Sequence, residues 1–193
     1  LWIRKIGIVL MVGMGYFVLD YDIVRIIRPI ILDGLTALNI DVNVLLNYQP
    51  TKQGINENTV YFYNIDDKDI GFMGRHSKYD SDQDKLIYKE SQIIETSFQV
   101  NTILKQDVNN LTITSKDLCR YVKMILQSTE TINILKENNL QILRASDIIN
   151  TPFTNGAGNY QYNPSFDFVI IHTQELEYNL NKIDTINQII NEV

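Results

Sequence analysis

Apolar and polar positions alternate along residues 85–105, a distance that few single strands reach. The even positions, which include Tyr88, Ile94, Phe98 and Val100, are mostly apolar or β-branched, and the odd positions are mostly polar. A period of two predicts a strand with one buried face and one solvent-exposed face. About twenty extended residues would span roughly 65 Å, whereas a compact chain of this length is about 40 Å across. We therefore expect this strand either to bend at a bulge or to leave its own domain.

Residues 165–178 alternate in the same way and are the expected antiparallel partner of the first long strand. Phe166, Phe168, Ile170 and His172 fall on one face of this second strand. A hydrogen-bonded histidine within a sheet is a commoner role than a ligand or a base. We therefore expect His172 to be structural.

Residues 60–65 are rich in aromatic and β-branched side chains, which favours a short strand. Residues 70–73 are its expected hairpin partner across a polar turn at 66–69. Gly71 and Gly74 suggest an edge or a bulge at this point.

Residues 75–84 read as a polar loop. Asp80, Asp82 and Asp84 have the spacing that begins a calcium-binding loop. Lys85 stands where the sharp turn of such a loop needs glycine, and Ser91 stands where a bidentate glutamate is needed. We therefore expect a solvated loop tip and no bound metal.

Helical spacing of apolar residues predicts helices at residues 21–39 and 114–126. Pro29 is expected to kink the first helix or to lie in its first turns, and Thr114 with Asp117 forms a credible capping box for the second. The remaining expected elements are a helical turn at 129–136, a short strand at 42–46, a strand at 140–149, loops at 47–54 and 152–163, and a helical arm at 181–193.

Residues 2–19 place Arg4 and Lys5 ahead of a fourteen-residue apolar run. This run is shorter than the ~20 residues that span a bilayer, and no small-residue cleavage site follows it. We expect an apolar extension or a mis-assigned start, with Met11 and Met14 as plausible alternatives. The expected organisation is an extension over residues 1–20, an α+β domain over 21–180 and an arm over 181–193.

The 193 residues are 45% hydrophobic and carry a formal net charge of -6. An acidic surface repels phosphates, so sequence-specific binding of DNA is not expected. Cys119 is the single cysteine, which excludes an intrachain disulfide framework and fits a reducing cytoplasm. Because Cys119 lies in a predicted helix and only His76 and His172 could serve as histidine ligands, we expect no nucleophile, no metal and no cofactor.

Several short stretches together carry a family resemblance. They are, in order, the helix IVRIIRPIIL, Tyr48-Gln49-Pro50-Thr51 with Gly54, the strand residues Glu90, Glu95, Phe98, Gln99 and Val100, Leu143 and Arg144 with Asp147, and Pro164-Ser165-Phe166-Asp167-Phe168. In this order and spacing the chain resembles the neck or tail terminator proteins of tailed bacteriophages from about Asp22 to Tyr178.

The resemblance implies an α+β fold: a mainly antiparallel sheet with a long β-hairpin, packed by two or three helices on one face. It also implies a structural, non-enzymatic protein of the virion that forms a ring, a hexamer by analogy, at the head-tail junction. Such a ring is assembled in the host cytoplasm, joins the tail to the connector, contacts other neck and tail proteins, and lets DNA pass without specific binding.

A ring needs one interface repeated until it closes, and ribbons that add to a neighbour's sheet provide one. We expect the two long strands to make the subunit contacts, with candidate side chains Tyr88, Ile94, Phe98, Val100, Phe166, Phe168 and Ile170. The alternative is a membrane-associated or secreted ligand-binding domain anchored by residues 6–19. An enzyme has no support from local motifs, since neither a nucleophile elbow nor a metal-ligand spacing is present.

Overall fold

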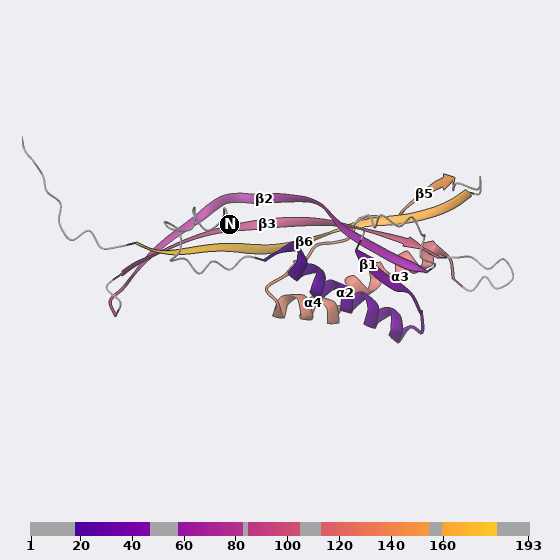
Figure 1. Cartoon of the computed structure of the whole chain (residues 1–193), viewed down its shortest axis with the longest axis horizontal. Coiled ribbons are helices and arrows are strands. Elements are labelled where there is room, and N and C mark those ends of the chain that lie inside the picture. Colours follow the sequence, from indigo (N-terminus) through magenta and orange to yellow (C-terminus); the bar gives the residue numbers. More distant parts are fainter. Residues whose placement is uncertain (1–17, 47–57, 83–84, 105–112, 155–159, 181–193) are drawn as a thin grey trace, which may run out of the picture. The chain divides into compact units, whose positions relative to one another are not determined.

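The protein is described by a computed structural model over residues 18–46, 58–82, 85–104, 113–154 and 160–180, and the structural statements below concern these residues. In the described part of the chain, one helix is followed by three strands, two further helices and three further strands (Figure 1). They are, in order, α2 (Asp20–Ala37), β1 (Asn43–Leu46), β2 (Thr59–Asp80), β3 (Lys85–Ile103), α3 (Ser115–Leu126), α4 (Thr129–Glu137), β4 (Gln141–Ile142), β5 (Ile149–Thr154) and β6 (Tyr160–Leu180).

The strands form one sheet in the order β1-β2-β3-β6-β4, with β5 also pairing with β6. β1 runs parallel to β2, whereas β4 and β5 are antiparallel to β6. The two long alternating strands, β3 and β6, are hydrogen-bonded neighbours, as the sequence predicts. The expected α+β fold with a mainly antiparallel sheet and a long hairpin is confirmed.

The chain divides into two compact units. The core unit comprises Val18–Ile70 and Ile94–His172. The described part of the other unit, called the ribbon here, comprises the ends of three strands: residues 71–80 of β2, 85–93 of β3 and 173–180 of β6.

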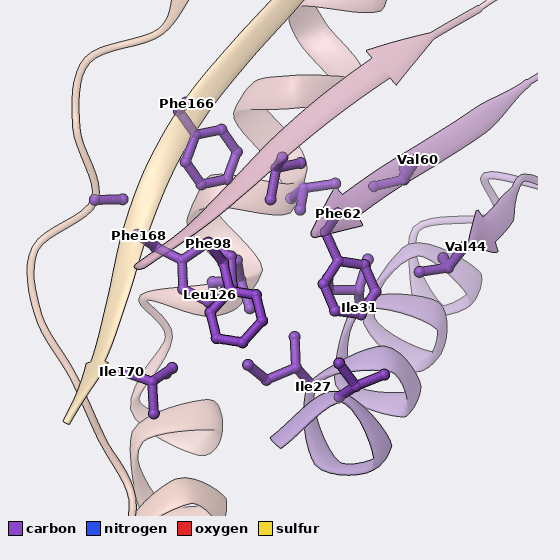
Figure 2. Packing of buried hydrophobic residues seen from close by; sticks show 14 of the residues in the cluster. Ile27, Ile31, Val44, Val60, Phe62, Phe98, Leu126, Phe166, Phe168 and Ile170 are labelled. Atoms are coloured by element: carbon purple, nitrogen blue, oxygen red, sulfur yellow. The ribbon is translucent and has the colours of Figure 1, made fainter. Parts of the chain in front are cut away.

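In the core unit, helices α2, α3 and α4 lie on the same side of the sheet (Figure 1). The apolar face of β3 and β6 is directed toward these helices, and Figure 2 shows Phe98 and Phe168 pointing toward Ile27 and Leu126. The rings of Phe98 and Phe168 stack with centroids 5.3 Å apart. Burying each such side chain contributes about 1.5–3 kcal/mol, so the contacts between this face and the helices stabilise the core unit.

Helix α2 buries its isoleucine stripe through Ile23, Ile27 and Ile31, as its spacing predicts. Pro29 lies inside the helix. Gly34 allows close packing on α3, because a Cβ at this position would lie 2.7 Å from Cγ2 of Ile125.

The capping box of α3 is confirmed: the Thr114 hydroxyl accepts from the backbone N–H of Asp117 at 3.1 Å, and the Asp117 carboxylate accepts from the backbone N–H of Thr114 at 3.2 Å. The Thr114 hydroxyl also donates to Asp117 Oδ2 at 2.6 Å, and this bond, together with the one from the Thr114 N–H, lowers the pKa of Asp117. Just after the C-terminal end of α4, Asn139 has φ 57°, and the following residue, Leu140, donates its N–H to Leu135 O at 2.9 Å. This left-handed asparagine satisfies carbonyls that a helix end leaves open.

The strand expected at residues 60–65 is present as the first part of β2, but the prediction for the residues after it is wrong. The expected hairpin across residues 66–69 and the expected loop at 75–84 are replaced by one strand that continues to Asp80, with a turn at 81–82. β2 is hydrogen-bonded to β3, so the backbone of this segment is paired although its side chains are mostly polar. A strand at the edge of a sheet does not require apolar side chains. The suggested irregularity is present at Gly71, whose φ is +70°.

The strand expected at residues 140–149 is also wrong. Gln141 and Ile142 form the short ladder of β4, the chain then follows β6 through separate bonds from Leu143 N to Val169 O and from Ser146 N to Asp167 O, and Ile149 begins β5. The loop expected at 152–163 is shorter than predicted, because β5 continues to Thr154 and β6 begins at Tyr160.

Candidate subunit-contact surface

The ribbon consists of three strand segments with β3 in the middle. On the side away from β3, β2 pairs with β1 only as far as Phe62. On its side away from β3, β6 pairs with β4 and β5 only as far as Ile171. In the ribbon, therefore, the outer sides of β2 and β6 have no partner among the strands that the structure describes.

One face of the ribbon carries an ion pair between neighbouring strands: Lys89 Nζ on β3 lies 2.7 Å from Glu175 Oε2 on β6. Glu177, two residues after Glu175 on β6, lies on the same face. The hydrogen bond to Glu175 raises the pKa of Lys89, and the charge of Glu177 adds to this effect. Gly74 belongs to the same face, because a Cβ there would lie 2.8 Å from Ser91 Oγ.

The opposite face carries a second ion pair, between Arg75 Nε on β2 and Glu90 Oε1 on β3 at 3.2 Å. Beside it the rings of Tyr88 and Tyr178 meet at a centroid distance of 5.0 Å. Partial burial raises the pKa of Tyr178, and the neighbouring Glu90 carboxylate adds to this effect. Each face thus contains one ion pair between adjacent strands, and the second face also contains the tyrosine pair.

The two outer strands differ in charge. Since side chains alternate between the faces of a strand, His76 and Lys78 share the face of Gly74 on β2. On that face β6 presents Glu175 and Glu177. Asp80 also lies on this face, so β2 carries one positive charge there, at Lys78, and one negative charge, at Asp80, whereas Glu175 and Glu177 make β6 acidic.

Phe72 on β2 is 102% exposed. It follows Gly71, whose left-handed backbone a residue with a Cβ would rarely adopt. Met73 and Tyr79 on the same strand are also exposed, at 48% and 52%. A strand with large apolar side chains in solvent marks a surface that another molecule covers.

Catalytic chemistry finds little support among the described residues. No three His, Cys, Asp or Glu side chains there come together in a way that could hold a metal ion. Cys119 is buried, and burial raises the pKa of its thiol to about 12, which leaves it protonated and unreactive. Among the helices in the described ranges, none is long and apolar enough to cross a membrane.

The sequence pattern of the family described as E217 gateway protein gp29 matches residues 22–181. The chain belongs to this gateway protein family. The resemblance to phage neck and tail terminator proteins is thereby confirmed, and with it a structural role of that type.

Among solved structures, the chain is similar to the sheath/tube terminator of PVC, an extracellular contractile injection system, in its extended state. The TM-score is 0.48 at 8% sequence identity, and the match covers 92% of this chain and 65% of that chain. A search of curated proteins found no match.

The structure divides the candidate contact residues of this gateway family member into two groups. Tyr88 and Ile94 are half-buried, on β3. The others have side chains that are at most 1% exposed and pack inside the core unit (Figure 2): they are Phe98, Val100, Phe166, Phe168 and Ile170. These five side chains are already covered within one copy, because the apolar face that alternation identifies packs on the protein's own helices.

The family-motif loop lies outside the described residues; it comprises Tyr48, Gln49, Pro50, Thr51 and Gly54.

Sequence reasoning missed the exposed residues of β2, including Phe72 and Lys78, because it assigned them to a hairpin and a loop. Residues 65–79 are exposed on both faces apart from Ile70, so the alternation that identifies a half-buried strand is missing. The expected role of His172 is confirmed: its Nε2 lies 3.0 Å from Thr96 Oγ1 within the buried sheet face.

Proposed function

We propose that this gateway family member forms a homo-oligomeric ring, a hexamer by family resemblance, at the head-tail junction of a phage virion. The ring joins the tail to the connector and contacts other neck and tail proteins. The observation that carries the proposal is the ribbon, whose outer strands have no described partner.

Unpaired strand edges favour completion by another chain. An exposed edge presents a row of backbone donors and acceptors, which soluble proteins cover or pair. A neighbouring copy that adds its strands satisfies these groups and gains specificity from alternate side chains. Because the same two edges occur on every copy, the contact repeats until the ring closes.

Charge supports passage of DNA through such a ring. The chain carries a formal net charge of -6, and a protein gains affinity for DNA chiefly by neutralising phosphates with lysine and arginine. A ring of acidic subunits has little such affinity, which suits a passage through which DNA slides. The single cysteine, Cys119, is consistent with assembly in the reducing cytoplasm of the host.

Deletion of the ribbon tip tests the proposal. Replacing residues 79–88 with a short glycine-containing turn removes the end of the hairpin and leaves the core unit intact. We expect a folded monomer, with the same helical circular dichroism signal as the full chain. Rings of the shortened protein in negative-stain micrographs would contradict the role given to the ribbon.

A further inference from the structure

His172 has one buried ring nitrogen that no described group contacts through a hydrogen bond. Its side chain is 3% exposed, and its Nε2 lies 3.0 Å from Thr96 Oγ1. The other nitrogen, Nδ1, is buried and has no partner among the described residues. Buried polar atoms in folded proteins are nearly always hydrogen-bonded, and leaving one unpaired is costly. Nδ1 is therefore expected to bind a further group.

Asn64 has a second atom of this kind in the same core unit. Its Oδ1 is buried and has no hydrogen-bond partner in the described ranges. Its Nδ2, in contrast, donates to Asp20 Oδ2 at 3.0 Å and lies 3.5 Å from both carboxylate oxygens of Asp67. Because an ionised carboxylate only accepts hydrogen bonds, these contacts fix which end of the amide is the nitrogen. The buried end of Asn64 is thus an acceptor that needs a donor.

Strand pairing places Asn64 and His172 in one row. Too few residues separate β2 from β3 for a parallel crossover, so these neighbouring strands run antiparallel. Phe62 and Phe98 meet across the two strands with ring centroids 6.4 Å apart. Two positions further toward the ribbon, on the same face, lie Asn64 and Thr96. Since Thr96 bonds to His172 on β6, the three polar side chains form a row across β2, β3 and β6.

The charges around His172 agree with this arrangement. Burial lowers the pKa of His172, and the two carboxylates that oppose this effect are those of Asp67 and Asp20. These are the same two carboxylates that Asn64 Nδ2 contacts. The unpartnered atoms of Asn64 and His172 therefore lie near one and the same pair of acidic side chains.

We propose that the core unit binds one ordered water molecule, which joins Asn64 Oδ1 to His172 Nδ1. Buried waters of folded proteins occupy such positions, where they bond to polar groups that the chain leaves unpaired. A metal ion is the poorer candidate, because in the described ranges no three potential metal-ligating side chains come together. This inference concerns the core unit alone and does not depend on the proposed ring.

Water fits this position with either tautomer of the histidine. If Thr96 donates to Nε2, then Nδ1 carries the ring proton and donates it to the water, which donates in turn to Asn64 Oδ1. If Nε2 instead donates to Thr96, the water donates one proton to Nδ1 and the other to Asn64. In both cases each unpartnered atom gains a hydrogen bond.

A crystal structure of the wild-type full chain that shows ordered solvent tests the site directly. We expect one water peak within about 3 Å of both Asn64 Oδ1 and His172 Nδ1. A direct bond between the two side chains, a different group bound to either atom, or no peak between them would overturn the inference.

A double-mutant cycle tests the bridge in solution. Asn64→Leu and His172→Leu each remove one end of it and leave the water with a single anchor, whereas the double variant removes both ends. The unfolding equilibrium constant of the double variant should therefore be about fivefold smaller than the single effects multiplied together predict. Urea unfolding at neutral pH measures all four proteins, and single effects that simply multiply would contradict the bridge.

The matched control is Asn101→Leu combined with His172→Leu. Asn101 is half-buried on β3 but lies on the opposite face of the sheet from Thr96. Its effect should multiply with that of His172→Leu, because no shared water joins the two positions. Coupling of equal size in this control would show that the first cycle reports a general loosening of the sheet, which would overturn the inference. Because the crystallographic test uses the wild-type chain, it decides the question even where a variant does not fold.

Discussion

Oγ1 of Thr96 on β3 lies 3.0 Å from Nε2 of His172 on β6, and both side chains are almost fully buried. The other ring nitrogen, Nδ1, is buried and has no hydrogen-bond partner in the described part of the chain. Burial lowers the pKa of His172, and the carboxylates of Asp67 and Asp20 oppose this effect in part. The neutral imidazole is therefore the form that the fold accommodates.

The lowered pKa of His172 predicts that acid weakens the fold. The unfolded chain takes up a proton near the ordinary histidine pKa of about 6.5, whereas the folded chain resists protonation until lower pH. The stability that depends on neutral His172 is complete above about pH 6.5 and falls as the pH drops below it. Urea unfolding between pH 5 and 8 measures this slope.

Replacing His172 with glutamine should flatten the pH dependence between pH 5 and 6.5, because the group that resists protonation is gone. The control is His76→Gln, which makes the same substitution at an exposed position of β2. An equal slope in the wild type and in His172→Gln would contradict this account.

Close packing between α2 and α3 gives a second prediction. Gly34→Ala would place a methyl group 2.7 Å from Ile125 Cγ2, so overpacking should lower the free energy of unfolding by about 1–3 kcal/mol, even though alanine favours helices. In a double-mutant cycle, Gly34→Ala with Ile125→Ala should cost at least about 1 kcal/mol less than the sum of the single changes. Additive costs would mean that the two positions do not touch.

Two phenylalanines should differ sharply in their contribution to stability. Phe98 is fully buried and stacks on Phe168, so Phe98→Ala should lower the free energy of unfolding by about 3–5 kcal/mol. Phe72 is fully exposed, so Phe72→Ala should change it by less than about 0.5 kcal/mol while reducing assembly. Chemical denaturation of both variants, with mass photometry of the second, makes the comparison. A stable Phe98→Ala protein with impaired assembly would contradict this account and show that Phe98 contributes to the subunit interface.

Cys119 should resist thiol reagents while the protein is folded. Its pKa is raised to about 12 by burial, so at pH 8 almost none of the thiol is ionised. Labelling with a chromogenic disulfide should be slow in buffer and complete in denaturant. Ser77→Cys, at an exposed position of β2, provides a matched site that reacts at once. Rapid labelling of the native wild-type thiol would show that the helix carrying it opens readily.

Alternation in the sequence was sufficient to predict β3, β6 and the sheet histidine, because burial of one face imposes a period of two. It failed for β2, where both faces of residues 65–79 are exposed apart from Ile70 and only pairing with β3 maintains the strand. It also directed the interface prediction toward Phe166 and Phe168, since the pattern marks a buried face without saying whether another copy or the protein's own helices cover it.

The mass of the purified full chain at micromolar concentration tests the central claim most directly. Mass photometry should show a closed multiple of the 22.4 kDa subunit, which negative-stain averages resolve as a ring. A single species of one subunit mass at every concentration would contradict the account.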